Sequence, residues 1–474
     1  MDKKWLTFMM GGLLMCVPVF SQNDILESSD LQVIASLLAD DSDVAKEYAE
    51  KIIKKDKENT DLIAAIGTVF LRAEKLEDAT AYFNRAQRCK RISVKAINLG
   101  GDIARMKNQL DSAQYYYGRS MYFDRKNPEA YYKYANLMKN TDVDKAITAL
   151  NVLKVNRPDI NVDKKIAGIY YTVNNIDKAV EVYQTINVDS LDDEDLIQYA
   201  LSLFLKKDYE KSLEFAALGH KRSIENPVFN RLMLYNNTEL NDYDAAVNSA
   251  NDLFYHSKGA KYQYQDYIYY GYALNGLGKT QEAIEQFNIA LQKNADEPSI
   301  KKQIAEAYAR INDYDKAIKY YTEYLASLKT DDANRAYDLY QLGRLYWKKG
   351  IDNKDGDAMT LEKTDALNQA NKVFGELATL RPDSYLGYYW QAKANTLLDP
   401  EYKKGLAKPY FLKAAELLEK SGESKEQLIE CYKQISYYYY IKKELNTAVE
   451  YAYKIQGLDP DDEYAKQMIS TVRK

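Results

Sequence analysis

The sequence repeats itself with a period close to 34 residues, and this period constrains the fold more than any other feature. A small residue recurs with gaps of 33 to 37 residues at Ala45, Ala79, Ala113, Ala146, Ala179, Ser212, Ala246, Ala283 and Ala317. It continues at Ala370, Ala407 and Ala448, across gaps of 53, 37 and 41 residues. A fixed period of this length indicates one structural unit built many times over.

Each repeat carries the pattern of two packed helices. Four residues after many of the small residues stands a bulky one, such as Tyr117 or Phe287, and three residues later often another apolar one, such as Ala290. These positions share one face of an α-helix. Twelve residues before the small residue there is usually a second small residue, as at Gly67 and Gly101. We expect a first helix there, crossing the second so closely that a larger side chain would push the backbones apart.

Turn-forming residues separate the two expected helices, as at Asn174-Asn175, Asn241-Asp242, Gly276-Leu277-Gly278 and Asn312-Asp313. Prolines stand where repeats end, at Pro158, Pro382 and Pro460. A proline at a repeat boundary ends a helix without removing an internal hydrogen bond.

In these positions the chain resembles the tetratricopeptide repeat family, whose signature W-x2-L-G-x2-Y, A-x3-F and P recurs about every 34 residues. The resemblance covers residues 26 to 460. It implies an all-α fold, a right-handed α-solenoid of about twelve helical hairpins in which each hairpin contacts its neighbours. After Pro460 we expect a capping helix over 461–473, with Tyr464, Met468 and Val472 facing the array.

We divide the chain into residues 1–21, N-terminal repeats over 22–265 and C-terminal repeats over 266–474. The wide gap before Ala370 is interpreted as an insertion over 351–369, a solvated loop that lengthens one hairpin. The segment from Gly356 to Glu362 has the G-x5-E spacing of a calcium loop, and calcium binding is the alternative hypothesis. Ile351 stands at the first ligand position and offers no side-chain oxygen, so we predict no metal there.

Residues 1–21 have the pattern of a secretory signal. Lys3 and Lys4 precede the apolar run from Trp5 to Phe20, and Ser21 supplies the small residue for cleavage. Acylation of Cys16 is the alternative, although Met15 before it is bulkier than the residue such a signal usually carries. We therefore expect an exported protein that is released into the periplasm. Association with the outer membrane, through an envelope complex, is a further expectation.

Composition excludes several classes of function. The chain has 65 Lys and Arg against 70 Asp and Glu, a net charge of −5, which argues against nucleic-acid binding. Two histidines without metal-ligand spacing leave no set for a metal centre or for nucleophilic catalysis. We predict no cofactor, no metal and no enzymatic activity, and no other segment long and apolar enough to span a membrane.

Tyrosine is far more frequent than the other aromatic residues, with 44 Tyr against 12 Phe and 3 Trp, and this bias is the most informative feature of the composition. In this family the first helices line the concave side, and several aromatic and basic residues are expected on their outward face. The predicted groove residues are Tyr132, Tyr171, Tyr235, Tyr272, Lys302, Arg310, Tyr340, Arg344, Trp347, Lys348 and Tyr437.

The sequence thus predicts a non-catalytic protein–protein interaction scaffold of the cell envelope. A partner protein or peptide would lie in the concave groove, where rigid rings bind at low entropic cost. The alternative is a glycan-binding module that stacks sugars on the same Tyr and Trp rings. Coplanar rings beside Asp, Asn or Gln would favour the glycan, and Lys or Arg beside the rings would favour the peptide.

Overall fold

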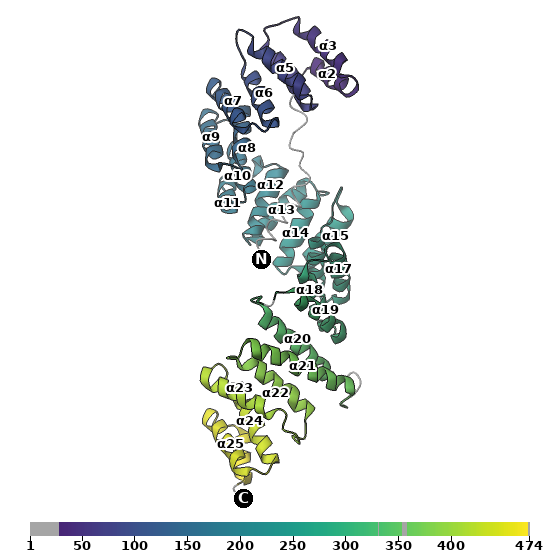
Figure 1. Ribbon diagram of the computed structural model, residues 1–474, viewed down its shortest axis with the longest axis vertical. Coiled ribbons are helices and arrows are strands. Elements are labelled where there is room, and N and C mark those ends of the chain that lie inside the picture. The colour runs from purple at the N-terminus through teal and green to yellow at the C-terminus, as the bar shows by residue number, and fades with distance from the viewer. Residues whose placement is uncertain (1–27, 330, 353–357, 473–474) are drawn as a thin grey trace. The chain divides into compact units, whose positions relative to one another are not determined.

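The computed structural model describes residues 28–329, 331–352 and 358–472, and these contain helices and no strand (Figure 1). The predicted all-α fold is confirmed, whereas the signal and acylation predictions for residues 1–21 lie outside the described residues. The chain divides into two compact units. Unit 1 comprises Met1–Leu240 and Asn248–Ala260, and unit 2 comprises Asn241–Val247 and Lys261–Lys474.

Unit 1 contains six helical hairpins within its described residues. They are α2 (Ser29–Asp40) with α3 (Ser42–Ile53), α4 (Thr60–Arg72) with α5 (Leu76–Gln87), α6 (Val94–Met106) with α7 (Leu110–Phe123), α8 (Pro128–Met138) with α9 (Val143–Asn156), α10 (Asp163–Thr172) with α11 (Ile176–Tyr183), and α12 (Asp193–Leu205) with α13 (Tyr209–Arg222). A 3-10 turn, η2 (Val188–Ser190), precedes α12.

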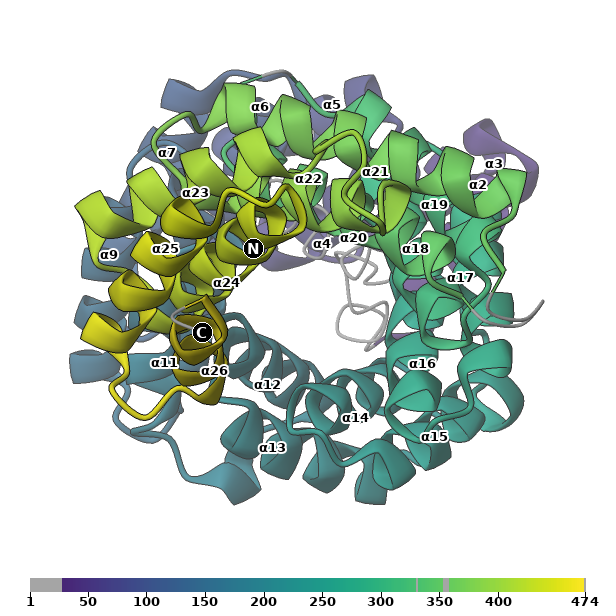
Figure 2. The ribbon, with the colours of Figure 1, turned by 90° about the horizontal axis from the view of Figure 1, so that it is seen from below.

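A seventh hairpin follows in the chain. It pairs α14 (Pro227–Glu239) with α15 (Tyr243–Asn251), which continues as the π-helical turn η3 (Asp252–His256). The remaining hairpins belong to unit 2, where α16 to α19 follow one another as neighbours (Figure 2). They are α16 (Tyr264–Gly276) with α17 (Thr280–Lys293), α18 (Pro298–Arg310) with α19 (Tyr314–Ser327), α20 (Arg335–Gly350) with α21 (Leu361–Leu380), α22 (Tyr385–Leu398) with α23 (Lys408–Ser421), and α24 (Lys425–Ile441) with α25 (Leu445–Leu458).

The described residues therefore form twelve hairpins, as the period predicts, and α26 (Glu463–Val472) follows the last one. Asp462 begins this helix, accepting a hydrogen bond from the backbone N–H of Ala465 at 3.0 Å. Met468 is buried against the last hairpin, and Tyr464 and Val472 pack at its edge, so the predicted capping helix is confirmed. None of the helices in the described ranges is long and apolar enough to cross a membrane.

The recurring small residues lie where the two helices of a hairpin touch. All twelve of them are buried, and each second helix except the longer α21 begins within a few residues of its small residue. The backbones are close there, because the hydroxyl of Ser212 on α13 donates to the carbonyl oxygen of Ala200 on α12 at 2.7 Å. Ser436 on α24 makes the same bond to the carbonyl oxygen of Ala448 on α25, at 2.8 Å.

The glycines of the first helices have a more specific role than close backbone crossing. A Cβ atom at Gly101 would lie 2.4 Å from Cε1 of Tyr117, the bulky residue four positions after the small residue of α7. The corresponding distances are 2.4 Å at Gly271 and at Gly343, in both cases to a buried phenylalanine of the second helix. The glycine leaves room for this aromatic ring, which contacts the backbone of the first helix.

The turns inside the hairpins also recur with the period. Asn108, Asn174, Asn241 and Asn312 all adopt positive φ angles between 57° and 61°. The left-handed conformation disfavours most side chains, and asparagine is among the few that tolerate it. The predicted turns are therefore confirmed by their backbone geometry. Pro158, Pro382 and Pro460 each follow the end of a second helix by two residues, as expected.

The insertion over 351–369 is not the loop that we predicted. Helix α20 continues to Gly350 and α21 begins at Leu361, so residues 361–369 add turns to the second helix. Lys363, Ala366 and Leu367 are buried, and this contact with α20 stabilises the longer hairpin. Of the proposed calcium ligands, Glu362 forms an ion pair with Lys349 at 2.7 Å, while residues 353–357 lie outside the described part of the chain.

We expect Gly101→Ala to destabilise the protein by about 1–2 kcal/mol. Forcing an extra carbon into a filled site costs about 1–3 kcal/mol, which exceeds the gain of up to about 1 kcal/mol from replacing a helical glycine. Urea unfolding measures the difference. Gly457→Ala on α25 is the control, because nothing lies within 4 Å of its Cβ position and the substitution should be neutral or stabilising. Equal effects of the two substitutions would contradict the ring–glycine contact.

Candidate partner-binding face

Within each unit, we call the outward side of the first helices the first-helix face, and the predicted groove residues all lie on first helices. Two of them are not accessible. Tyr171 and Tyr235 are each 2% exposed, so neither lines a binding surface, which corrects their assignment. Their rings point into the packing between helices, where Tyr235 lies 6.0 Å from Phe204. Burial raises the pKa of Tyr171 to about 12.

Tyr132 and Tyr272 are half-buried at the edge of the core. The ring of Tyr272 meets Phe287 edge-on, with centroids 5.7 Å apart. Packing against the core explains why both positions are aromatic, and each residue leaves part of its ring at the surface. Tyr437 on α24 is 39% exposed, and its ring lies 5.2 Å from that of Tyr402.

Lys302 has a partner inside the protein. Its Nζ lies 2.7 Å from Oδ1 of Asp338, a carboxylate on the next first helix that is fully buried. The hydroxyls of Tyr321 and Tyr324 donate to the same carboxylate, at 2.8 and 3.0 Å. Burial and the neighbouring carboxylate raise the pKa values of both tyrosines, so they remain donors. Lys302 therefore compensates Asp338 and is not a free cation for a partner, contrary to our prediction.

Pairs of this kind link consecutive first helices in both units. A lysine of one hairpin meets a carboxylate of the neighbouring hairpin or cap at Lys133–Asp102 (2.5 Å), Lys164–Asp195 (2.5 Å), Lys302–Asp338 (2.7 Å), Lys393–Glu430 (2.8 Å) and Lys433–Asp462 (2.5 Å). Tyrosine hydroxyls donate to three of these carboxylates. We call this set the lysine–carboxylate ladder.

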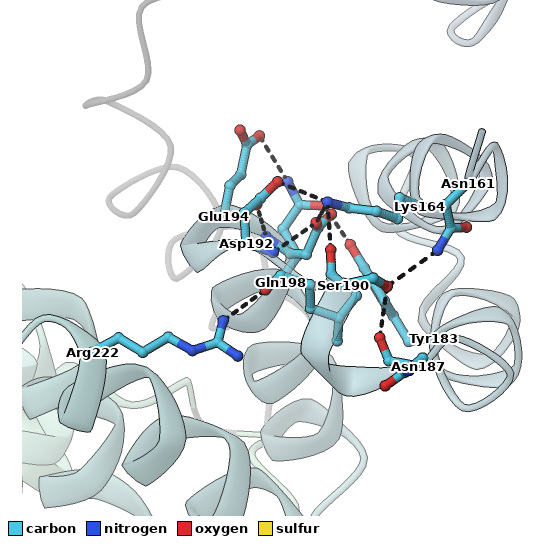
Figure 3. Close-up of polar contacts among 11 residues, drawn as sticks. Asn161, Lys164, Tyr183, Asn187, Ser190, Asp192, Glu194, Gln198 and Arg222 are labelled. Atoms are coloured by element: carbon cyan, nitrogen blue, oxygen red, sulfur yellow. Dashed lines mark hydrogen bonds and ion pairs between the residues drawn. The ribbon is translucent and has the colours of Figure 1, made fainter. Parts of the chain in front are cut away.

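Figure 3 shows the densest of these links, between α10 and α12. Lys164 reaches Asp192 at 2.9 Å and the carbonyl oxygen of Ser190 at 3.0 Å, besides Asp195. Burial disfavours the charged lysine, but its bonds to the two aspartates outweigh this and raise the pKa of Lys164. Arg222 closes the network from α13 by donating to the carbonyl oxygen of Leu191 at 2.7 Å. These side chains satisfy one another, so we interpret the network as a structural link between hairpins.

One group of predicted residues has a different environment. On α20, the guanidinium of Arg344 lies 5.6 Å from the centroid of Tyr340 and 5.9 Å from that of Trp390 on α22. Within the described residues Arg344 forms no ion pair or hydrogen bond, unlike the lysines of the ladder. Trp347 lies 5.3 Å from the same indole, at an interplanar angle of 81°. We call Tyr340, Arg344, Trp347 and Trp390 the arginine–aromatic cluster.

Arg310 and Lys348 border this part of unit 2. Arg310 is exposed in the last turn of α18, and Lys348 is partly exposed in the last turn of α20. Among the described residues neither forms an ion pair. Arg310, Arg344 and Lys348 therefore carry positive charge that no ion pair within the described residues compensates, whereas Lys302 is paired.

Trp390 is the residue that the sequence analysis missed. Its indole contacts Tyr340, Trp347, Phe374 and Tyr389, so it holds the cluster together. A signal was present: Trp390 stands four residues before the buried Ala394, the spacing of tryptophan and glycine in the repeat signature. The wide gaps on both sides of this repeat obscured that register.

No protein-family model matches the sequence, and no curated protein matches it. Among solved structures, the C-terminal part of a TPR repeat-containing protein from Cytophaga hutchinsonii is 27% identical, and the similarity covers 58% of this chain and 99% of that one, with a TM-score of 0.49. MamA MSR-1 is 17% identical over 35% of this chain and 94% of its own, with a TM-score of 0.32. A chain of the APC/C hetero-tetramer Cut9–Hcn1 is 13% identical over 94% and 83%, with a TM-score of 0.32. The hairpins described above have the organisation of tetratricopeptide repeats, as the sequence resemblance implies.

The ladder predicts that Lys302→Met destabilises unit 2 by about 2–3 kcal/mol, somewhat less than the 3–5 kcal/mol typical of a broken buried pair because Lys302 keeps some solvent contact. Urea unfolding of the full chain checks this. Adding Asp338→Asn should recover part of the loss, since it removes the unpaired charge. Lys372→Met, an exposed lysine on α21, serves as control. A loss no larger than that of the control would contradict a stabilising role of the pair.

Buried tyrosines predict a loss of stability at alkaline pH. Burial raises the pKa values of Tyr82 and Tyr171 from 10.0 to about 12. Unfolded tyrosines lose their protons near pH 10, whereas the folded ones stay neutral, so this stability is present below pH 10 and is lost as the pH rises towards 12. The urea midpoint should fall across this window, and Tyr171→Phe should reduce the fall. A midpoint independent of pH from 10 to 12 would contradict the assignment.

Proposed function

We propose that this protein is a non-catalytic scaffold that binds a partner protein or peptide on the first-helix face of unit 2. The arginine–aromatic cluster is the observation that carries the proposal. The lysines of the ladder already have carboxylate partners, whereas Arg344 faces two rings and no acid among the described residues. The N–H groups of the Arg344 guanidinium therefore remain available to donate hydrogen bonds to a ligand.

The chemistry of the cluster selects a carboxylate beside an apolar group. A guanidinium stacked over aromatic rings still presents its N–H groups at the edge of its plane, where a carboxylate accepts two hydrogen bonds. The rings of Tyr340 and Trp390 supply apolar surface next to that edge, and both residue types are frequent at binding hot spots. An acidic side chain or a chain terminus of a peptide, with an apolar neighbour, fits this arrangement.

Ring geometry supports the peptide over the glycan alternative. Trp390 meets Tyr340, Trp347 and Tyr389 at interplanar angles of 71°, 81° and 89°. Sugar stacking uses a flat aromatic surface, and rings set edge to face do not extend one another into such a platform. The polar side chain at these rings is the cation Arg344, which favours an acidic peptide.

We further propose that the protein acts in the cell envelope, after export and removal of residues 1–21, where an outer-membrane complex is the candidate partner. The charged start, apolar run and Ser21 of the N-terminal segment support this proposal. Sequencing the N-terminus of the protein recovered from a periplasmic fraction tests it, with Gln22 as the expected first residue.

The binding proposal is tested with the full chain as immobilised bait and an envelope fraction as the source of partners. We expect Arg344→Glu and Tyr340→Ala to lower recovery of the specific partner at least about tenfold, because truncating a hot-spot residue costs about 2 kcal/mol or more. Raising the salt concentration should also weaken binding, since the contact is an exposed ion pair.

Arg381→Glu is the matched control, an exposed arginine of unit 2 at the end of α21 and outside the cluster. Its bait should recover the partner as well as the wild type. If Arg344→Glu and Arg381→Glu recover the partner equally, the cluster is not the binding site, although the hairpin fold would be unaffected.

A further inference from the structure

Helix α7 of unit 1 presents apolar residues outward as well as inward. Its inner face carries the buried Ala113 and Tyr117, as expected for a second helix. On the other side, Tyr115 is 62% exposed and Tyr122 is 75% exposed. Together with Asp111 and Gly118 they are spaced i, i+4, i+7 and i+11, which places all four along one stripe of the helix. We call this the outer stripe of α7.

Two opposite charges, one on the outer stripe and one beside it, are not used inside the chain. Asp111 and Arg119 form no ion pair or hydrogen bond among the described residues, and the Arg119 guanidinium lies 5.5 Å from the ring of Phe123. Asp111 stands four residues before Tyr115 in the chain, and Arg119 stands four residues after it. At 1.5 Å per residue this places both charges about 6 Å along the helix axis from Tyr115.

The surface at the level of Tyr115 is hollowed. A depression of about 520 Å³ is lined by Asp111, Gln114, Tyr115, Gly118, Arg119, Met121 and Tyr134. At Gly118 nothing lies within 4 Å of the position that a Cβ atom would occupy, so the backbone of α7 is open to close approach. The hollow has room for an aromatic side chain from another molecule.

We propose that two copies of this chain associate through the outer stripes of their α7 helices, packed antiparallel about a two-fold axis next to Tyr115. The symmetry brings Arg119 of each copy to the level of Asp111 of the second copy, and Tyr115 of each copy to the hollow of the other. Two ion pairs then flank a central aromatic contact.

Self-complementarity is the reason for choosing a second copy as the occupant. In a two-fold contact the same patch serves both molecules, so opposite charges must be placed symmetrically about the axis. Asp111 and Arg119 meet this condition about Tyr115. A partner of a single charge sign would find one of the two groups repulsive or unpaired, and an uncharged partner would leave both unpaired.

Charge reversal gives a sharp test. Sedimentation equilibrium of the full chain, from about 1 to 300 µM to allow for a small interface, should show the mass rising from 54.6 kDa towards twice that value. Asp111→Arg puts like charges against each other in both pairs, and so does Arg119→Asp. Each variant alone should remain monomeric. An equimolar mixture of the two should recover the association, because every contact in the mixed dimer joins Arg to Asp.

Asp144→Arg is the matched control, because Asp144 holds the same place in the first turn of α9 and is exposed. It should associate as the wild type does. The proposal is overturned if the wild type stays monomeric at the highest concentration, if the control weakens association as much as Asp111→Arg, or if the mixture fails to associate. The mixture distinguishes lost contacts from misfolding, since misfolded variants would not rescue each other.

Discussion

In several hairpins, the contact between an aromatic ring of the second helix and a glycine of the first helix underlies the structure. At Gly101, Gly271 and Gly343 the ring occupies the space that a side chain would need, because a Cβ atom there would lie only 2.4 Å from a ring atom. Since this contact fixes how the helices of a hairpin cross, it also sets which residues point outward. The partly exposed positions of Tyr340 and Arg344 follow from the register that Gly343 imposes on α20.

A second set of contacts determines the charge that the first-helix face offers to a partner. The lysine–carboxylate ladder joins neighbouring hairpins, or the last hairpin and the cap, at five places, and three of its carboxylates accept tyrosine hydroxyls as well as lysines. Lysines that look basic in sequence are thereby neutralised. Arg344 is not paired in this way within the described residues, and its planar group can stack on rings, whereas lysine offers only a point charge. This division is the reason for placing the proposed binding site at the arginine–aromatic cluster.

Periodic features were predictable from sequence, and contacts between distant positions were not. The packing positions of the small residues, the turns inside the hairpins and the capping helix each depend on local spacing, and all were predicted. The burial of Tyr171 and Tyr235 was missed because a one-residue change of register moves a ring from the surface into the core. The pairing of Lys302 was missed because Asp338 lies 36 residues away, and the helical part of the 351–369 insertion because its apolar contacts are made with α20.

The sequence by itself determined the repeating hairpin, the number of hairpins and the residue types at their contacts, because helix periodicity and turn chemistry act over a few residues. Only the tertiary structure decided which tyrosines are accessible, which cations are already paired, and that Trp390 joins Tyr340 and Trp347 in one cluster. Those outcomes depend on the angle and rotation with which neighbouring hairpins pack. That geometry results from many side-chain contacts acting together, so no single motif specifies it.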